Sequence, residues 1–138
     1  MKKSGILNSE IAKVVDDLGH TDKVCIGDCG LPVPSGVKKI DIALRFGEPS
    51  FQSVLDNYLD NVVIEKVYLA QEIKENNSEQ EKQILAKLGA EIEVVYISHE
   101  ELKQMNTQVK AVIRTGEATP YSNIILQSSV NMPHDSDI

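Results

Sequence analysis

The sequence predicts a single α/β domain, a three-layer sandwich whose central, mainly parallel or mixed sheet is flanked by helices. Short apolar runs rich in valine and isoleucine alternate along the chain with segments whose apolar residues recur at helical spacing. With 138 residues, of which 41% are hydrophobic and 25% charged, the chain has the size and composition of one globular domain.

The N-terminal third is predicted to form a helix and two strands. Asn8 or Ser9 is a suitable cap for a helix with apolar residues at helical spacing, and Gly19 is expected to end it. Residues 23–27 form a continuous apolar run, which is typical of a buried strand. Residues 39–44 alternate sufficiently to predict a second, shorter strand.

The middle of the chain repeats the alternation. Pro49 is expected to open a second helix, since proline is favoured in the first helical turn. Residues 62–70 predict a third strand. Ser78 and Glu81 have the spacing of a capping box for a third helix, which Gly89 is expected to close.

The C-terminal third contains three more predicted strands and a short helix. Residues 91–97 predict a strand, and Ser98 and Glu101 repeat the capping-box spacing directly after it. Final strands are predicted at residues 111–114 and 124–128. The last residues, 131–138, form a polar tail with one proline, so we expect them to fray.

Charge and composition exclude several classes of partner. The net charge of −7, without a basic cluster, argues against nucleic acid or an anionic membrane as a partner. No apolar run approaches the ~20 residues needed to cross a bilayer, and the N-terminus lacks the apolar region of a signal peptide. We therefore expect a cytoplasmic protein. The spacing of Cys25 and Cys29 matches neither a disulfide framework nor a zinc-binding pattern. We therefore expect both to be small buried apolar residues rather than a redox pair.

Polar residues follow several of the predicted strands. Ligands of open α/β sheets bind beyond the carboxyl ends of the strands, where Asp28, Gln71, Glu72 and His99 are expected. His20 follows Gly19, and a histidine close to a carboxylate such as Asp28 is a small unit for acid–base chemistry.

The other two histidines have different surroundings. His99 falls in the first turn of a capped helix, where the positive end of the helix dipole favours a neutral imidazole. His134 lies in the polar tail and is interpreted as a bystander.

Metal and cofactor chemistry are not favoured. His20, Asp28 and His99 are chemically sufficient ligands, but no pair has the compact spacing of a metal motif, so no metal is predicted. The sequence has no Gly-x-Ser-x-Gly elbow, no phosphate-binding loop and no dinucleotide fingerprint. We therefore predict no cofactor.

A second polar cluster lies between the last two strands. Tyr121 and Asn123 would face the same side of an extended segment, and both groups can donate and accept hydrogen bonds. This arrangement suits a ligand rich in hydroxyl groups. A tight turn in which Asn123 bonds its own backbone is an equal alternative.

The ordered set of motifs resembles the family of D-ribose pyranases and fucose mutarotases (the RbsD/FucU type). The matching pieces are Leu7-Asn-Ser9, Leu18-Gly-His-Thr-Asp22, Asp28-x-Gly-Leu-Pro-x-Pro34, Ile40-Asp41, Glu72-Ile-Lys74, His99-Glu100, Ala111-Val-Ile-Arg-Thr-Gly-Glu117 and Pro120-Tyr-x-Asn123. They extend to about Gln127, so residues 1–130 are expected to form one domain of this type. The Asp28 loop and the Arg114-Thr-Gly-Glu117 segment favour the ribose pyranase branch.

The resemblance implies a cytoplasmic, cofactor-free isomerase that interconverts the pyranose and furanose forms of D-ribose. It implies a homodecamer of two pentameric rings, with each active site at a subunit boundary. The family's proton donor falls on His20, and its sugar-binding residues fall on Asp28, His99, and the Tyr121-Ser122-Asn123 element, which a neighbouring subunit is expected to deliver. Whether Asp28 orients His20 or binds a hydroxyl stays open.

Two departures from the family pattern and two alternative functions accompany this expectation. Relatives usually carry alanine where this chain has Cys29, and they tend to end in an aromatic residue that residues 131–138 lack. The alternatives are a fucose-type mutarotase, which exchanges anomers, and a non-catalytic ribose-binding module.

Overall fold

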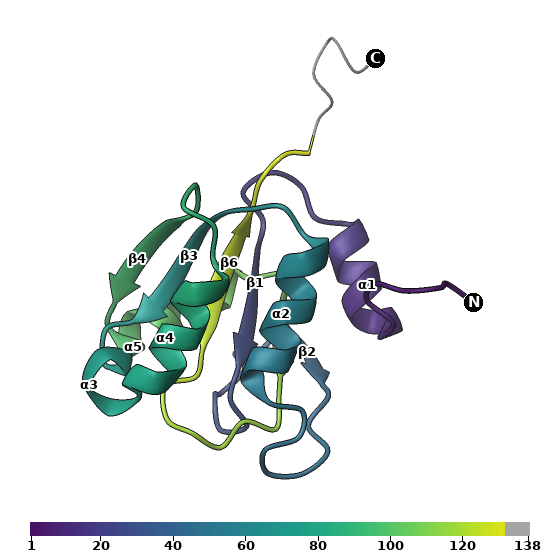
Figure 1. Cartoon of the computed structure of the whole chain (residues 1–138). Helices are drawn as coiled ribbons and strands as arrows, with labels where there is room; N and C mark the ends of the chain where they lie inside the picture. Colours follow the sequence, from purple (N-terminus) through teal and green to yellow (C-terminus); the bar gives the residue numbers. More distant parts are fainter. Residues whose placement is uncertain (132–138) are drawn as a thin grey trace.

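A computed structural model describes residues 1–131 and has the expected alternation of strands and helices (Figure 1). In chain order the elements are α1 (Ser9–Asp16), β1 (Lys23–Gly27), β2 (Lys38–Asp41), α2 (Phe51–Asn61), β3 (Ile64–Ala70), α3 (Ile73–Asn76), α4 (Ser78–Lys87), β4 (Glu93–Ile97), α5 (His99–Met105), the 3-10 helix η1 (Asn106–Gln108), β5 (Ala111–Arg114) and β6 (Ile124–Ser128). Residues 132–138 of the predicted polar tail lie outside the described residues.

The six strands form one mixed sheet in the order β2-β5-β1-β6-β3-β4. Neighbouring strands are parallel except on either side of β6, which runs antiparallel to both β1 and β3. A chain-terminal strand is thus inserted in reverse at the centre of an otherwise parallel sheet.

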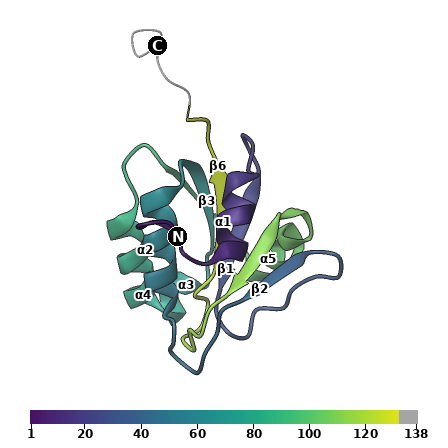
Figure 2. The same ribbon diagram turned by 90° about the vertical axis from the view of Figure 1, so that its right-hand side faces the viewer.

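Helices cover both faces of the sheet, which confirms the three-layer prediction. Seen from the side, α2 and α4 lie on one face and α5 on the other (Figure 2). Alternate residues of β1 supply the two cores: Val24 and Ile26 pack with the helices α1, α2 and α4, whereas Cys25 packs with Leu102 of α5. This period of two is what a sheet buried on both sides requires.

Two of the predicted helix starts are confirmed. Asn8 caps α1, because its Oδ1 accepts a hydrogen bond from the N–H of Ile11 at 3.0 Å. Ser98 and Glu101 form the expected reciprocal capping box at α5. These caps satisfy backbone N–H groups that otherwise have no partner in the first turn of a helix.

Two boundaries near the first two helices were predicted wrongly. The first helix ends at Asp16 rather than at Gly19, and the left-handed residue of the following turn is Thr21, with φ of 73°. The second helix starts at Phe51 and not at Pro49, because Ser50 supplies the capping oxygen to the N–H of Ser53.

The capping box predicted at Ser78 is also wrong by one residue. Asn77 is the cap of α4, and its Oδ1 accepts from the N–H of Gln80. Glu81 instead accepts a hydrogen bond from the hydroxyl of Tyr96 at 2.6 Å, which joins α4 to β4. The short α3 was not predicted.

Strand direction defines two edges of the sheet. The carboxyl ends of β1, β3, β4 and β5 lie together, and the reversed β6 places its amino end among them; we call this the Asp28 edge. The other end, where β1 begins and β6 finishes, is called the His20 edge. Within residues 1–131, no helix is long and apolar enough to span a bilayer.

Candidate active site

Asp28 lies directly after β1, and the loop that follows holds its carboxyl group. Its Oδ1 accepts a hydrogen bond from the N–H of Gly30 at 3.0 Å, and its own N–H donates to Asn123 Oδ1 at 2.9 Å. Burial raises the pKa of the Asp28 carboxyl above its ordinary value, although these hydrogen bonds and nearby His99 oppose the shift. The group is a partly dehydrated acceptor that benefits from a hydroxyl donor.

His99 is the first residue of α5 and is fixed through its backbone. Its N–H donates to both carboxylate oxygens of Glu72, each at 3.1 Å. Its ring stands edge-on to the ring of Tyr121, with centroids 5.2 Å apart and an interplanar angle of 86°. Among residues 1–131, its buried Nδ1 has no hydrogen-bond partner. A buried unpaired nitrogen is costly, so we expect this atom to bond a partner that the described residues do not supply.

Tyr121 and Asn123 reach the Asp28 edge by a tight turn rather than along an extended segment. Tyr121 has a left-handed backbone with φ of 57°, so the expected alternation of two side chains on an extended strand is wrong. The N–H of Asn123 bonds the carbonyl of Tyr121 at 2.9 Å, but its side chain reaches across the sheet to Asp28. The backbone of this segment therefore forms a turn, as the alternative interpretation expected, but the Asn123 side chain bonds Asp28 and not its own backbone.

Ser122 is buried within the same turn. Its Oγ lies 2.8 Å from Thr119 Oγ1 and accepts a hydrogen bond from Asn77 Nδ2 at 3.2 Å. Asn77 also donates to the carbonyl of Pro120 at 2.8 Å, so the cap of α4 anchors the turn. The hydroxyl of Ser122 is thus engaged in shaping the turn that presents its two neighbours.

A set of hydrogen bonds after β5 fixes the loop beyond Asp28. Arg114 donates through Nε to the carbonyl of Cys29 at 2.9 Å and through Nη1 to both carboxylate oxygens of Asp41, at 3.2 and 3.1 Å. Thr115 Oγ1 donates to the carbonyl of Gly27 at 2.8 Å. These residues belong to the motif quoted above, but nothing in the sequence assigns them this supporting role.

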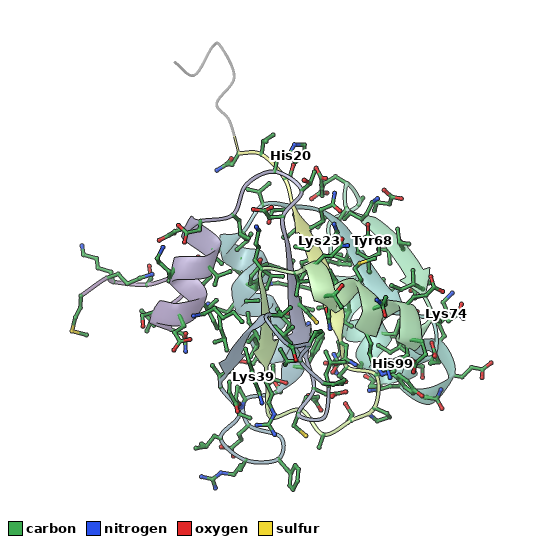
Figure 3. All side chains as sticks on the ribbon, turned by 180° about the vertical axis from the view of Figure 1, so that it is seen from behind. His20, Lys23, Lys39, Tyr68, Lys74 and His99 are labelled. Carbon is green, nitrogen blue, oxygen red and sulfur yellow. The ribbon has the colours of Figure 1, made fainter. Side chains whose placement is uncertain are left out.

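His20 lies at the other end of β1, on the His20 edge. Figure 3 shows His20 at one end of the sheet and His99 well away from it, toward the other end. A strand of five residues such as β1 is roughly 17 Å long, far beyond the reach of a hydrogen bond. The expectation that Asp28 lies close enough to orient His20 within one chain is therefore wrong.

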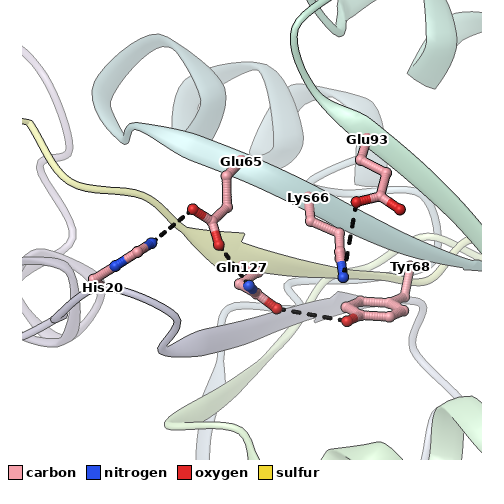
Figure 4. Close-up of polar contacts among 6 residues, drawn as sticks. All are labelled: His20, Glu65, Lys66, Tyr68, Glu93 and Gln127. Atoms are coloured by element: carbon pink, nitrogen blue, oxygen red, sulfur yellow. Dashed lines mark hydrogen bonds and ion pairs between the residues drawn. The ribbon is translucent and has the colours of Figure 1, made fainter.

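The carboxylate that contacts His20 is Glu65 of β3. His20 Nε2 lies 2.8 Å from Glu65 Oε1, and Glu65 Oε2 accepts from Gln127 Nε2 at 2.6 Å (Figure 4). Sequence reasoning missed Glu65, because the two residues are 45 positions apart and only the order of the strands brings them together.

The predicted site residues thus fall into two groups. Asp28, His99, Tyr121, Ser122 and Asn123 gather at the Asp28 edge of one chain, so the Tyr121-Ser122-Asn123 element belongs to the same chain as Asp28 and His99. Its delivery by a neighbouring subunit to the site that contains His20 stays a prediction. His20 is the separated residue. In the described part of the chain, no three His, Cys, Asp or Glu side chains form a group that could hold a metal ion. Burial raises the pKa of the Cys25 thiol to about 12, which makes it a poor nucleophile.

Comparison with known proteins places this arrangement in a family. The model of the RbsD / FucU transport protein family matches residues 1–131. The D-ribose pyranase of Lactococcus lactis subsp. lactis is 72% identical over 130 residues, covering 94% of this chain and 98% of the relative.

Two solved structures agree with the fold. The structure of Bacillus subtilis RbsD complexed with D-ribose has a TM-score of 0.92 and 52% identity, covering 96% of this chain and 100% of the other. The fucose mutarotase of Streptococcus pneumoniae in complex with L-fucose has a TM-score of 0.75 and 19% identity, covering 91% and 95%, and shares the fold. The chain therefore belongs to the RbsD / FucU transport protein family.

Proposed function

We propose that the protein is a D-ribose pyranase, a cytoplasmic isomerase that interconverts the pyranose and furanose forms of D-ribose without a cofactor. The observation that carries this proposal is the Asp28 edge, where a partly buried carboxyl group and the unpartnered Nδ1 of His99 lie beside Tyr121 and Asn123. Such a set suits a small polyol. The 72% identity to a D-ribose pyranase supports ribose as that polyol, whereas the 19% identity to the fucose enzyme supports only the fold.

Changing the ring size of ribose requires opening and reclosing a hemiacetal. In opening, the bond between the anomeric carbon and the ring oxygen breaks, and its electron pair stays on the ring oxygen, which takes up a proton. The anomeric hydroxyl loses its proton, and the electrons of that O–H bond form the carbonyl group. Acid–base catalysis by groups that titrate near neutrality suits both transfers and contributes about 10²–10⁴-fold.

His20 is the proton donor in this proposal and His99 the acceptor. His20 protonates the ring oxygen, while Nδ1 of His99 takes the proton of the anomeric hydroxyl. On closure by a different hydroxyl, that hydroxyl returns a proton to His20, and His99 protonates the new anomeric oxygen. Both side chains regain their starting states, and no covalent intermediate forms.

The remaining residues of the site bind the sugar. Asp28 accepts from a sugar hydroxyl, since its carboxyl group is partly buried and held by the N–H of Gly30. Tyr121 and Asn123 hold the open-chain aldehyde while its bond rotates. Ser122 contributes through the shape of the turn.

Separation of His20 from Asp28 supports an active site shared between subunits. The His20 edge of one copy would meet the Asp28 edge of its neighbour, as expected of a homodecamer built from two pentameric rings. Exposed apolar side chains support association at both edges: Leu44 and Phe46 near the Asp28 edge are 69% and 83% exposed, and Val63 and Val130 near the His20 edge are 43% and 46% exposed.

Saturation-transfer NMR on D-ribose tests the function. Catalytic amounts of the protein are expected to accelerate exchange between pyranose and furanose anomeric protons, and His20→Ala is expected to abolish the acceleration while keeping the fold. Acceleration on fucose alone would instead indicate a mutarotase. Ribose binding without acceleration would indicate the non-catalytic module.

A further inference from the structure

His20 is held by a chain of contacts across three elements of the sheet. His20 precedes β1, whereas Glu65 lies on β3, and β6 runs between these two strands. The 2.8 Å contact joins His20 Nε2 to Glu65 Oε1 (Figure 4). The loop carrying His20 is fixed as well, because the N–H of Thr21 donates to the carbonyl of Ser128 at 2.9 Å.

Glu65 is itself anchored. Gln127 of β6, with 9% of its surface exposed, donates to Glu65 Oε2 at 2.6 Å, and its Oε1 lies 3.5 Å from the hydroxyl of Tyr68. Hydrogen bonds from Gln127 and then His20 hold the pKa of the Glu65 carboxyl below its ordinary value. Glu65 therefore stays ionised at neutral pH, and it presents an acceptor in a fixed position.

An ionised carboxylate accepts hydrogen bonds and cannot donate one. Contact with Glu65 Oε1 therefore requires the proton of a neutral His20 to sit on Nε2. Nδ1 then carries the lone pair, and within residues 1–131 it makes no hydrogen bond. The side chain of His20 is 50% exposed and lines a cavity, so the imidazole is accessible to a ligand.

We infer that Glu65 is a positioning residue for His20, one that orients the imidazole and makes Nδ1 the nitrogen that exchanges a proton with the substrate. The catalytic consequence rests on the proposed function, whereas the tautomer is a property of the protein alone. During ring opening, protonated His20 gives the Nδ1 proton to the ring oxygen and keeps its Nε2 proton directed at Glu65. Closure returns one proton to Nδ1.

Stabilisation of the fold does not explain the pair. The side chains of His20 and Glu65 are 50% and 32% exposed, and exposed ion pairs contribute little to the free energy of unfolding. A carboxylate placed against the far nitrogen of a catalytic histidine has a clearer role in choosing the tautomer, and misassignment of a tautomer lowers turnover strongly in other enzymes.

Glu65→Gln tests the inference through two independent readouts. Imidazole ¹⁵N NMR, with the His20 signals identified by their loss in His20→Ala, is expected to show the Nε2–H tautomer in the wild-type protein. In Glu65→Gln we expect a mixture, because an amide can donate as well as accept. On ribose, the variant is expected to lose about 10-fold or more in kcat, with KM within about twofold, because Glu65 does not contact the sugar.

Glu93→Gln is the matched control. It removes the same charge from the adjacent strand β4, where Glu93 Oε1 lies 3.8 Å from Lys66 Nζ, and is expected to leave the tautomer and kcat unchanged. Gln127→Met, which removes the anchor of Glu65, is expected to give a smaller loss in kcat.

The outcomes separate the two proposals. A wild-type protein that does not accelerate ribose exchange refutes the proposed function, and the tautomer measurement then still decides what Glu65 does. An active wild-type protein whose Glu65→Gln variant keeps the tautomer and kcat refutes the role of Glu65. Equal losses in Glu65→Gln and Glu93→Gln would also refute it, because they would indicate a general effect of charge.

Discussion

Asn123 Oδ1 accepts a hydrogen bond from the backbone N–H of Asp28 at 2.9 Å and so ties the beginning of β6 to the end of β1. Asn123 is 1% exposed, so the bond is made in a place that water hardly reaches. It fixes the direction in which the loop carrying Asp28 leaves the sheet, and it brings the turn of Tyr121 beside His99.

Asn123→Ala is expected to destabilise the fold and to weaken ribose binding. It leaves the N–H of Asp28 without its partner, and an unsatisfied buried donor costs about 1–3 kcal/mol. Urea denaturation measures the free energy of unfolding, and ribose exchange measures the site. Asn57→Ala is the control, because its exposed amide makes a long bond of 3.4 Å to the carbonyl of Gly5. Equal stability of the two variants would contradict the prediction.

Asp28→Asn is expected to increase stability at neutral pH while abolishing ribose exchange. Burial raises the pKa of Asp28 in the folded protein, so ionisation of this carboxyl disfavours folding. Its unfavourable contribution is absent below the unfolded pKa and grows as pH rises through the higher folded pKa. Asparagine keeps an oxygen for the N–H of Gly30 but cannot ionise.

Thermal unfolding of both proteins across a pH series checks this prediction. Asp28→Asn and the wild type should differ little at acid pH, and the variant should gain an advantage as pH approaches neutrality. A difference in melting temperature that is constant with pH would show that ionisation of Asp28 does not matter.

Gly27→Ala is expected to destabilise the fold and to displace side chains that support the candidate site. A methyl group at position 27 would lie 2.6 Å from Leu31 Cδ2 and 3.0 Å from Asn123 Oδ1, so both side chains must move. Overpacking of this kind costs about 1–3 kcal/mol. At Gly19 a methyl group would meet its nearest neighbour, Asp22 Oδ2, at an ordinary 3.6 Å, so Gly19→Ala serves as the control for stability. A Gly27→Ala protein as stable as Gly19→Ala would count against this packing.

Mixing two inactive variants tests whether active sites are shared between subunits. His20→Ala and Asp28→Asn are each expected to be inactive alone. After joint unfolding and refolding of equal amounts, random assembly leaves about one site in four with both residues intact, so activity should return to about a quarter of the wild-type value. Light scattering gives the mass of the assembly in the same samples. Mixtures that stay inactive at the full oligomeric mass would show that each site lies within one chain.

Sequence patterns predicted helix and strand boundaries well where the interacting residues are close together in the sequence. The strands at residues 111–114 and 124–128 have the predicted bounds, and the Ser98 and Glu101 capping box forms as expected. At α4 the same rule failed, because Asn77 also accepts the N-cap role and the contact with Tyr96 draws Glu81 away. The sequence alone does not show whether Asn77 or Ser78 caps α4, because the choice depends on the contact between Glu81 and Tyr96.

The sequence predicted those site residues that directly follow a strand. Asp28 and His99 follow parallel strands, so their common edge could be inferred from the sequence alone. The partner of His20 could not, because Glu65 comes into reach only through the order β1-β6-β3, and no local pattern encodes the position of a last strand inserted in reverse.

Reversal of β6 has a consequence for how neighbouring sites influence one another. Asn123 stands before one end of this five-residue strand and contacts Asp28, while Gln127 near its other end holds Glu65 against His20. In the proposed assembly these two ends belong to consecutive active sites around the ring. Each β6 then links one active site to the next through a single strand of roughly 17 Å, so consecutive sites share one structural element.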